Sequence, residues 1–162
     1  DADKIAGGHL HIRWGRPGEE VKLLNGQTVT VDDKVGVIAD SESVEALAGI
    51  MGGDATAVGS NTCNVYVEAA FWWPDAVAGR SRRYNFSTDA GHRFERGVDP
   101  AFTLPGLELA TQMILDLCGG EAGTVVQDGT PIDPTRTYQL NPARADRFQN
   151  GTQWPVFQRL RR

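Results

Sequence analysis

Residues 66–100 read YVEAAFWWPDAVAGRSRRYNFSTDAGHRFERGVDP. A strand-like apolar run, residues 65–67, leads into the stretch and brings one carboxylate, Glu68, into apolar surroundings. Aromatic residues follow, and a small polar turn, residues 87–91, then separates two groups of arginines. A single acid, a hydroxyl-bearing turn and a basic rim predict a pocket for a small group that is carried on a polyanion.

The basic rim stands out because the chain as a whole is acidic, with a formal net charge of -5 over 162 residues. Between positions 75 and 97, five arginines face three acids, a local excess of two positive charges. These arginines either form ion pairs on a solvated surface or contact a phosphate backbone. The arginines are Arg80, Arg82, Arg83, Arg93 and Arg96, and the acids are Asp75, Asp89 and Glu95.

The length of the chain allows one domain with a hydrophobic core. Its two cysteines, Cys63 and Cys118, form no C-x-x-C zinc spacing, and we expect both to be reduced, mostly buried thiols of a cytosolic protein. No apolar run approaches the roughly 18 residues of a membrane span. The N-terminus has no signal-peptide pattern. The chain opens within a motif and has no initiator Met, so we expect a piece of a longer protein.

Short strands are predicted in the first 50 residues. Residues 9–14 alternate in polarity, which places His9 and His11 on one face, either as an exposed polar face or as metal ligands that lack a third partner. Asn25-Gly26 predicts a hairpin between residues 21–24 and 28–31, because both turn residues tolerate positive φ. Further strands are predicted at residues 35–39 and 44–50, which together favour a largely antiparallel sheet.

Gly52-Gly53 ends the last of these strands. The pair is either a plain loop breaker or a place where the backbone approaches a ligand closely, since no side chain intervenes. Neither the G-x-x-x-x-G-K-S/T nor the G-x-G-x-x-G phosphate-binding pattern is present.

Helices are predicted at residues 74–84, at 90–96 and from about 100 to 118, with Pro105-Gly106 kinking or delaying the last one. The spacing of its apolar residues predicts that it buries Leu107, Ala110, Ile114 and Leu117. A strand at residues 124–126 precedes a linker. The predicted fold class is α+β, with two mixed or antiparallel sheets and flanking helices in a layered sandwich.

Glu68 and Thr88 each have a structural and a functional interpretation. A carboxylate among apolar residues needs a partner, which is either a nearby arginine or a hydrogen-bonding group of a ligand. The hydroxyl of Thr88 either caps the short helix that follows or faces the pocket. No Ser-His-Asp order, reactive cysteine context or metal-ligand set is apparent.

Five motifs carry a resemblance to a known family. They are A-G-I-M-G-G at 48–53, E-A-x-F at 68–71, G-R-S-R-R at 79–83, T-D-A-x-H-R-F-E-R-G-V-D-P at 88–100 and C-G-G-E-A-G at 118–123. Their order and spacing resemble the editing domain of bacterial phenylalanyl-tRNA synthetase beta subunits. The resemblance covers residues 1–130, and residues 131–162 are expected to be a linker and the start of a following module.

The resemblance implies hydrolysis of tyrosine from misacylated tRNA(Phe) and assigns roles to individual residues. Glu68 would read the hydroxyl of tyrosine, and a water held by backbone and polar groups, helped by a tRNA hydroxyl, would attack the ester. The family also has a functional histidine just upstream of the segment that matches the start of this chain, whereas His92 is expected to be structural. The implied site consists of Thr88 as the catalytic residue, Glu68, Ala90, Gly52 and Gly53 around the substrate, and Arg80, Arg82 and Arg83 on the tRNA.

The implied partners are tRNA(Phe), the misattached tyrosine and the synthetase alpha subunit of a cytoplasmic heterotetramer, without a membrane. No cofactor or metal is expected in this chain, while the full synthetase would use ATP and magnesium. Two alternatives remain open: a non-catalytic tRNA- or protein-binding module of the same family, and a purely structural segment of a large subunit.

Overall fold

The computed structural model describes residues 1–130, 132 and 133. Residues 1–132 form one compact unit. The predicted linker and following module, residues 131–162, lie almost entirely outside the described residues.

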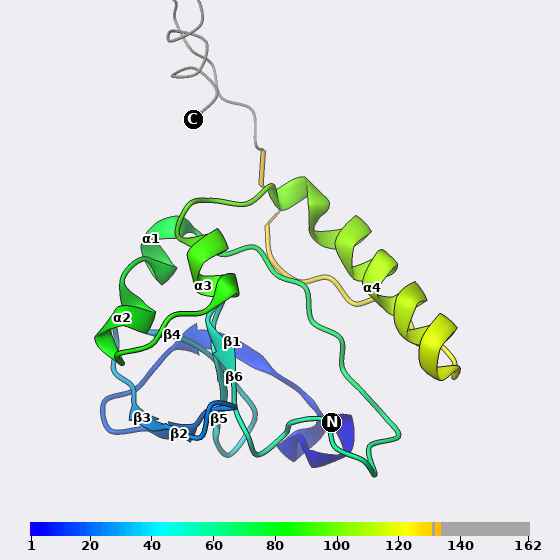
Figure 1. The fold of residues 1–162 in the computed structure, drawn as a ribbon, viewed down its shortest axis with the longest axis horizontal. Coiled ribbons are helices and arrows are strands. Elements are labelled where there is room, and N and C mark those ends of the chain that lie inside the picture. Colours follow the sequence, from blue (N-terminus) through cyan, green and yellow to red (C-terminus); the bar gives the residue numbers. More distant parts are fainter. Residues whose placement is uncertain (131, 134–162) are drawn as a thin grey trace, which may run out of the picture. The chain divides into compact units, whose positions relative to one another are not determined.

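Two antiparallel sheets form the centre of this unit, as the polarity patterns predicted (Figure 1). The larger sheet has the strand order β1-β4-β5-β6, and β2 pairs with β3 in the smaller one. The strands are β1 (His11–Trp14), β2 (Glu20–Lys22), β3 (Thr28–Thr30), β4 (Gly36–Ala39), β5 (Val44–Leu47) and β6 (Met51–Gly52). The mixed α and β class is confirmed.

The predicted hairpin is the β2–β3 ribbon, in which Glu20 pairs with Thr30 and Lys22 with Thr28. Its turn differs from the prediction that both central residues have a positive φ. Only Gly26 does, with a φ of 85°. The Gly26 N–H donates to the carbonyl of Leu23 at 2.8 Å.

The core lies between the two sheets. Its fully buried side chains come from strands β4 and β5 and from residues next to strands β2, β3 and β4. They are Leu23, Val31, Val35, Val37 and Leu47.

A long connector leads from β6 to the first helix and contains no strand. The strand predicted at residues 65–67 is therefore wrong: Val65 and Tyr66 are exposed, and the segment pairs with neither sheet. The strand predicted at residues 124–126 is also absent. Apolar β-branched residues alone do not make a strand where no sheet edge is available to pair with.

Three short helices follow the connector, and Figure 1 shows them close together beside the sheet. The helix predicted at 74–84 is broken at Gly79, whose φ of 76° lies outside the helical region. The helices are α1 (Pro74–Val77), α2 (Arg80–Arg83) and α3 (Asp89–Phe94), preceded near the N-terminus by the 3-10 turns η1 (Ala2–Lys4) and η2 (Ala6–Gly8).

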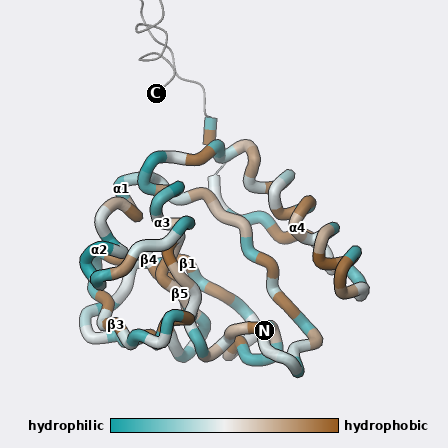
Figure 2. Tube along the Cα trace, in the orientation of Figure 1, coloured by the Kyte–Doolittle hydropathy of each residue, from teal (hydrophilic) through white to brown (hydrophobic). Residues whose placement is uncertain are grey.

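The last helix, α4 (Thr103–Cys118), follows the 3-10 turn η3 (Pro100–Phe102). Pro105 lies in its first turn, where proline is tolerated, so the predicted delay does not occur. The predicted burial is wrong, because α4 buries no residue and Leu117 is 79% exposed. Hydrophobic residues are visible along α4 in Figure 2. Periodicity identified an apolar face, but no described helix or strand buries it, and Leu104 and Leu107 are half-buried beside residues 126–128.

Both cysteines are exposed, which corrects the expectation that they are mostly buried. Among the described residues, no helix combines the length and the hydropathy that crossing a bilayer would demand.

Candidate functional site

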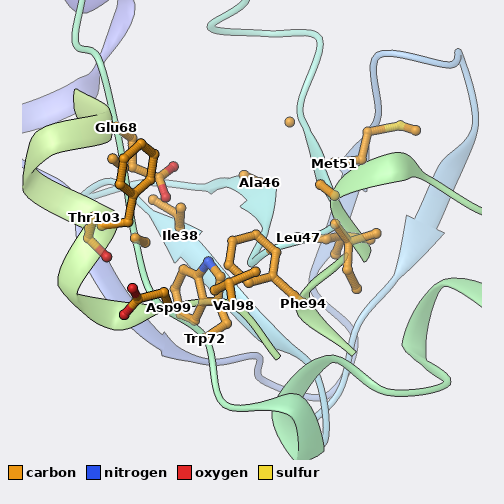
Figure 3. Close-up of a pocket in the computed structure, with 18 residues that line it drawn as sticks. Ile38, Ala46, Leu47, Met51, Glu68, Trp72, Phe94, Val98, Asp99 and Thr103 are labelled. Carbon is orange, nitrogen blue, oxygen red and sulfur yellow. The ribbon is translucent and has the colours of Figure 1, made fainter. Parts of the chain in front are cut away.

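A cavity of about 470 Å³ lies between the four-stranded sheet, the connector and the helices (Figure 3). The register of the sheet places Ile38, Ala46 and Gly52 side by side on the face that forms its floor, because Ile38 pairs with Ala46 and Ala46 with Gly52. Small side chains at Ala46 and Gly52 leave this floor open.

Glu68 reaches the cavity from the connector. The residue as a whole remains exposed, yet the protein around its carboxyl group removes enough water to raise its pKa. Within the described part of the chain, no arginine or other donor contacts this carboxylate, so the ion pair considered from the sequence does not form. An acceptor without a partner at the mouth of a cavity is suited to a ligand that donates a hydrogen bond.

Aromatic side chains line much of the remaining wall: Trp72, Phe94 and Phe102. The indole of Trp72 packs against the turn between β5 and β6, where a Cβ atom added to Gly49 would lie 2.7 Å from Trp72 Cδ1. Figure 3 shows Trp72, Val98 and Phe94 next to one another along this wall. The wall therefore has a flat apolar character that suits an aromatic ring.

The turn at residues 88–90 contributes one residue to the wall. Ala90, in the first turn of α3, lines the cavity. The Thr88 hydroxyl oxygen accepts a hydrogen bond of 3.0 Å from the N–H of Gly91, so it caps α3, and Thr88 is not among the residues that line the cavity. Because the oxygen is the acceptor, the hydroxyl proton stays available to donate.

The two glycines of the predicted pair have different surroundings. Gly52 lines the cavity, whereas Gly53 does not. The N–H of Gly53 donates to the carbonyl of Glu45 at 2.7 Å, and a Cβ atom on Gly53 would lie 2.6 Å from that same oxygen. Gly53 thus permits a close backbone approach within the sheet.

The predicted basic rim is largely engaged in contacts within the protein. Arg80 donates to three backbone carbonyls, those of Lys34, Asp75 and Ala78. Arg83 forms a two-armed contact with Asp32, at 3.0 and 2.5 Å, which lowers the Asp32 pKa to about 2.

The other three arginines of the rim have looser contacts with acids of the same stretch. Arg82 lies 3.7 Å from Glu95, with 74% of its side chain exposed, and Arg96 lies 3.1 Å from the same acid. Arg93 pairs with Asp89 at 3.1 Å.

The structure adds two polar residues that the sequence did not single out, Asp99 and Thr103, both of which line the cavity. The Asp99 carboxylate accepts from the N–H of Ala101 at 2.9 Å and so starts η3. Asp99 follows Gly97-Val98 and precedes Pro100, a pattern that indicates a helix start but does not reveal a neighbouring cavity.

The two histidines of the first strand region lie against each other, with ring centroids 4.6 Å apart, and both are exposed. No group of three or more candidate metal ligands occurs in the portion of the chain that the structure describes.

The sequence of this chain matches the B3/4 domain family over residues 1–119. It is 56% identical over 165 residues to a phenylalanine--tRNA ligase beta subunit of Cupriavidus pinatubonensis, which covers 99% of this chain and 20% of that protein. It is 60% identical over 147 residues to the Ralstonia nicotianae protein of the same name, covering 91% of this chain and 18% of that protein. The Burkholderia lata protein of that name is 56% identical over 148 residues.

The chain spans about a fifth of the length of these relatives. The match to the family includes the cavity floor, Glu68 and Ala90, all of which lie within residues 1–119. The resemblance found in the five motifs is confirmed: this chain is similar to a segment of phenylalanine--tRNA ligase beta subunits and belongs to the B3/4 domain family.

Proposed function

We propose that this chain forms an editing site that hydrolyses tyrosine from misacylated tRNA(Phe), within an enzyme that attaches phenylalanine to tRNA(Phe). The observation that carries the proposal is the unpartnered Glu68 carboxylate at a cavity with aromatic walls. Tyrosine matches both features of this site, because its aromatic ring suits the aromatic walls and its phenolic O–H can donate to the carboxylate.

This arrangement solves the problem that a phenylalanine enzyme faces. A synthetic pocket built for an apolar ring rejects an added hydroxyl only weakly, whereas a site that hydrogen-bonds the hydroxyl strongly rejects the analogue that lacks it. An editing pocket with Glu68 as the acceptor therefore accepts tyrosine and spares phenylalanine. Ala90 limits the size of the ring that the pocket admits.

The reaction is the attack of water on the carbonyl carbon of the ester, which releases tyrosine and leaves the ribose hydroxyl on the tRNA. Backbone and polar groups at the cavity would position the water, and a neighbouring ribose hydroxyl would help to carry the proton to the leaving oxygen. Thr88 does not line the cavity, so it would act as a positioning residue, by capping α3 and holding the turn that carries Ala90.

The partners of this function are tRNA(Phe) and the alpha subunit of a cytoplasmic heterotetrameric synthetase. ATP and magnesium serve the ligation reaction of that whole enzyme, and the proposal gives them no role in this chain. The support comes from the relatives, which are named as beta subunits of phenylalanine--tRNA ligase.

A deacylation assay tests the proposal. Tyrosyl-tRNA(Phe) and phenylalanyl-tRNA(Phe) are incubated with this chain and with a version extended upstream to include the family's histidine, and the free amino acid is measured. Hydrolysis of the tyrosyl ester but not the phenylalanyl ester is expected of the extended version. If neither ester is hydrolysed while tRNA still binds, the chain is a non-catalytic binding module. A chain that neither hydrolyses nor binds is a structural segment.

A further inference from the structure

The pocket face of the large sheet continues beyond the cavity onto the edge strand β1. Ile12 pairs with Ile38, and Ile38 is part of the cavity floor. Directly paired residues of antiparallel strands have side chains on the same face. Ile12 and Trp14, two positions apart, therefore extend the floor sideways, and the diagonal from Ile38 to Trp14 is roughly 7–8 Å.

This extension is an exposed apolar surface. Ile12 is 65% exposed and Trp14 is 52% exposed, whereas Ile38 beneath the cavity is only 6% exposed. Strand β1 lies at the edge of its sheet, and no element among residues 1–130 covers this part of it.

The orientation of the strand is held from its other face. The Arg13 guanidinium forms two hydrogen bonds with the Glu19 carboxylate, at 2.9 and 2.7 Å. Because Arg13 lies between Ile12 and Trp14 in the sequence, this ion pair on the opposite face keeps both apolar side chains turned toward the pocket face.

Two cations without an ion-pair partner among the described residues lie just beyond the end of the β1–β4 pair. The N–H of Gly15 donates to the carbonyl of Val35 at 2.8 Å, so their chain neighbours Arg16 and Lys34 lie just beyond the end of the strand pair. Both side chains are exposed, and neither forms an ion pair with any other described residue. The acids close to them in sequence, Glu19 and Asp32, already form ion pairs with arginines. The neighbouring acid Asp33 offsets part of their positive charge.

An exposed aromatic side chain followed by free cations is the combination that binds single-stranded nucleic acid, because bases stack on the ring and phosphates meet the charges. We propose that Ile12 and Trp14 form a stacking platform for a nucleobase at the 3′ end of the tRNA, and that Arg16 and Lys34 contact the adjoining phosphates. The inference rests on the proposed function, since it names where the nucleotide lies once its amino acid is in the cavity.

The platform also explains where the nucleoside of the bound substrate lies outside the cavity. An aminoacyl ester joins its side chain to a ribose, so the nucleoside must emerge next to the cavity. The sheet face near Trp14 offers this nucleoside an apolar surface that continues the cavity floor. The rim arginines Arg80 and Arg83 are already engaged by backbone carbonyls and Asp32.

The test uses one pocket ligand that lacks the nucleoside and one that carries it. Tyrosine methyl ester fills the cavity alone, and the hydrolysis-resistant 3′-amide analogue of tyrosyl-adenosine adds the ribose and the base. Both are titrated against the full chain, its Trp14→Leu variant and the control Trp73→Leu. Trp73 is a matched control, because it is 58% exposed and is not part of the cavity wall.

Trp14→Leu is expected to leave the affinity for tyrosine methyl ester unchanged and to lower the affinity for the adenosine analogue roughly 5- to 150-fold, the usual range for one stacked base. Trp73→Leu should change neither. Equal losses for both ligands, no loss for the analogue, or the same loss in Trp73→Leu would overturn the platform. Unchanged thermal midpoints of both variants would show that the fold is intact.

A third probe separates the platform from the editing function. The trinucleotide CCA has no amino acid, so its binding depends on the platform alone. If tyrosine methyl ester fails to bind but Trp14→Leu still weakens CCA binding, the editing proposal falls and the platform stands. If the wild-type chain instead dimerises, and Trp14→Leu abolishes the dimer without affecting either nucleotide ligand, the face is a protein interface and the platform is wrong.

Discussion

The Trp72 indole rests on Gly49 so closely that a Cβ atom at residue 49 would lie 2.7 Å from Trp72 Cδ1. Gly49 also has a φ of 67°, a conformation that side chains other than glycine rarely adopt. One glycine thus holds both the β5–β6 turn and the aromatic wall of the cavity in place.

Gly49→Ala should therefore destabilise the fold more than backbone strain alone would. The control is Gly26→Ala, because Gly26 has a φ of 85° and open space where its Cβ would lie. Strain alone is expected to cost Gly26→Ala about 1–2 kcal/mol, and the collision should add about 1–3 kcal/mol in Gly49→Ala. Urea unfolding measures both. Equal losses would show that Trp72 moves aside freely.

Glu68→Ala should weaken tyrosine binding and leave phenylalanine binding nearly unchanged. A hydrogen bond to a charged acceptor contributes about 1.5–3 kcal/mol, which corresponds to roughly 10- to 150-fold. Glu68→Gln should be intermediate, because its amide oxygen still accepts. Calorimetric titration of both amino acids, with Glu108→Gln on α4 as the control, checks this in the version extended upstream. Equal losses for the two ligands would mean that Glu68 supports the site without reading the hydroxyl.

The raised pKa of Glu68 predicts a pH dependence. Burial shifts this pKa above its ordinary value of 4.5, so the carboxylate gains its proton at a higher pH than a free glutamate would. A protonated carboxyl is a poorer acceptor, and tyrosine affinity should start to fall while the pH is still above 4.5. Glu68→Gln should abolish that dependence. Binding curves at a series of pH values provide the measurement, and an identical pH profile in the variant would refute it.

The same shift has a consequence of opposite sign for stability. The folded chain holds the Glu68 proton more tightly than the unfolded chain, so this contribution to folding is present at low pH and is lost as the pH rises through the folded-state pKa. Glu68→Gln should flatten that part of the stability profile. Thermal unfolding as a function of pH, compared with Glu108→Gln, follows it.

Arg80→Gln and Arg82→Gln should have different effects. Arg80 donates to three backbone carbonyls, so its loss should lower the free energy of unfolding by about 1–3 kcal/mol. Arg82 has a mostly exposed side chain and only a 3.7 Å contact with Glu95, so it remains available to phosphate. Its loss should reduce the salt slope of tRNA binding by about one. The reverse pattern would show that these two roles are exchanged.

Ala90→Leu should close the pocket without disturbing the fold. Ala90 is exposed at the first turn of α3 and lines the cavity, so a larger side chain there occupies the space that the tyrosyl ring needs. Tyrosine binding should be lost while the thermal midpoint stays within a few degrees. Ala110→Leu, on the exposed surface of α4, is the matched control and should leave binding unaltered. Retained tyrosine binding in Ala90→Leu would place the ring elsewhere.

The sequence predicted the elements whose signals are local. The alternation of residues 9–14 and the Asn25-Gly26 turn led to β1 and the β2–β3 hairpin, because period and turn chemistry act within a few residues. The exposed face of α4 and the unpaired run at 65–67 could not be predicted in this way. Whether an apolar face is covered, or an apolar run finds a sheet edge, depends on distant parts of the fold.

The cavity shows the same division. Gly52, Glu68 and Ala90 were selected through motifs, and the structure places all three around one space. Thr88 was selected in the same way, but its hydroxyl oxygen is used by Gly91, a choice between capping and pocket that residue type cannot settle. Asp99 and Thr103 escaped notice because only the path of the chain brings the start of α4 beside the sheet.

The floor of the cavity belongs to the sheet, whereas part of its wall belongs to a short helix and a connector. This difference affects how the selectivity of the cavity could change over generations. The floor is hydrogen-bonded sheet in which Gly53 tolerates no side chain, so its residues are constrained by the fold itself. Ala90 and Glu68 lie on a short helix and on a connector outside the sheet, where substitutions disturb little else. Under the proposed editing function, natural variation at those two positions would change which amino acid the cavity accepts while the sheet beneath them stays the same.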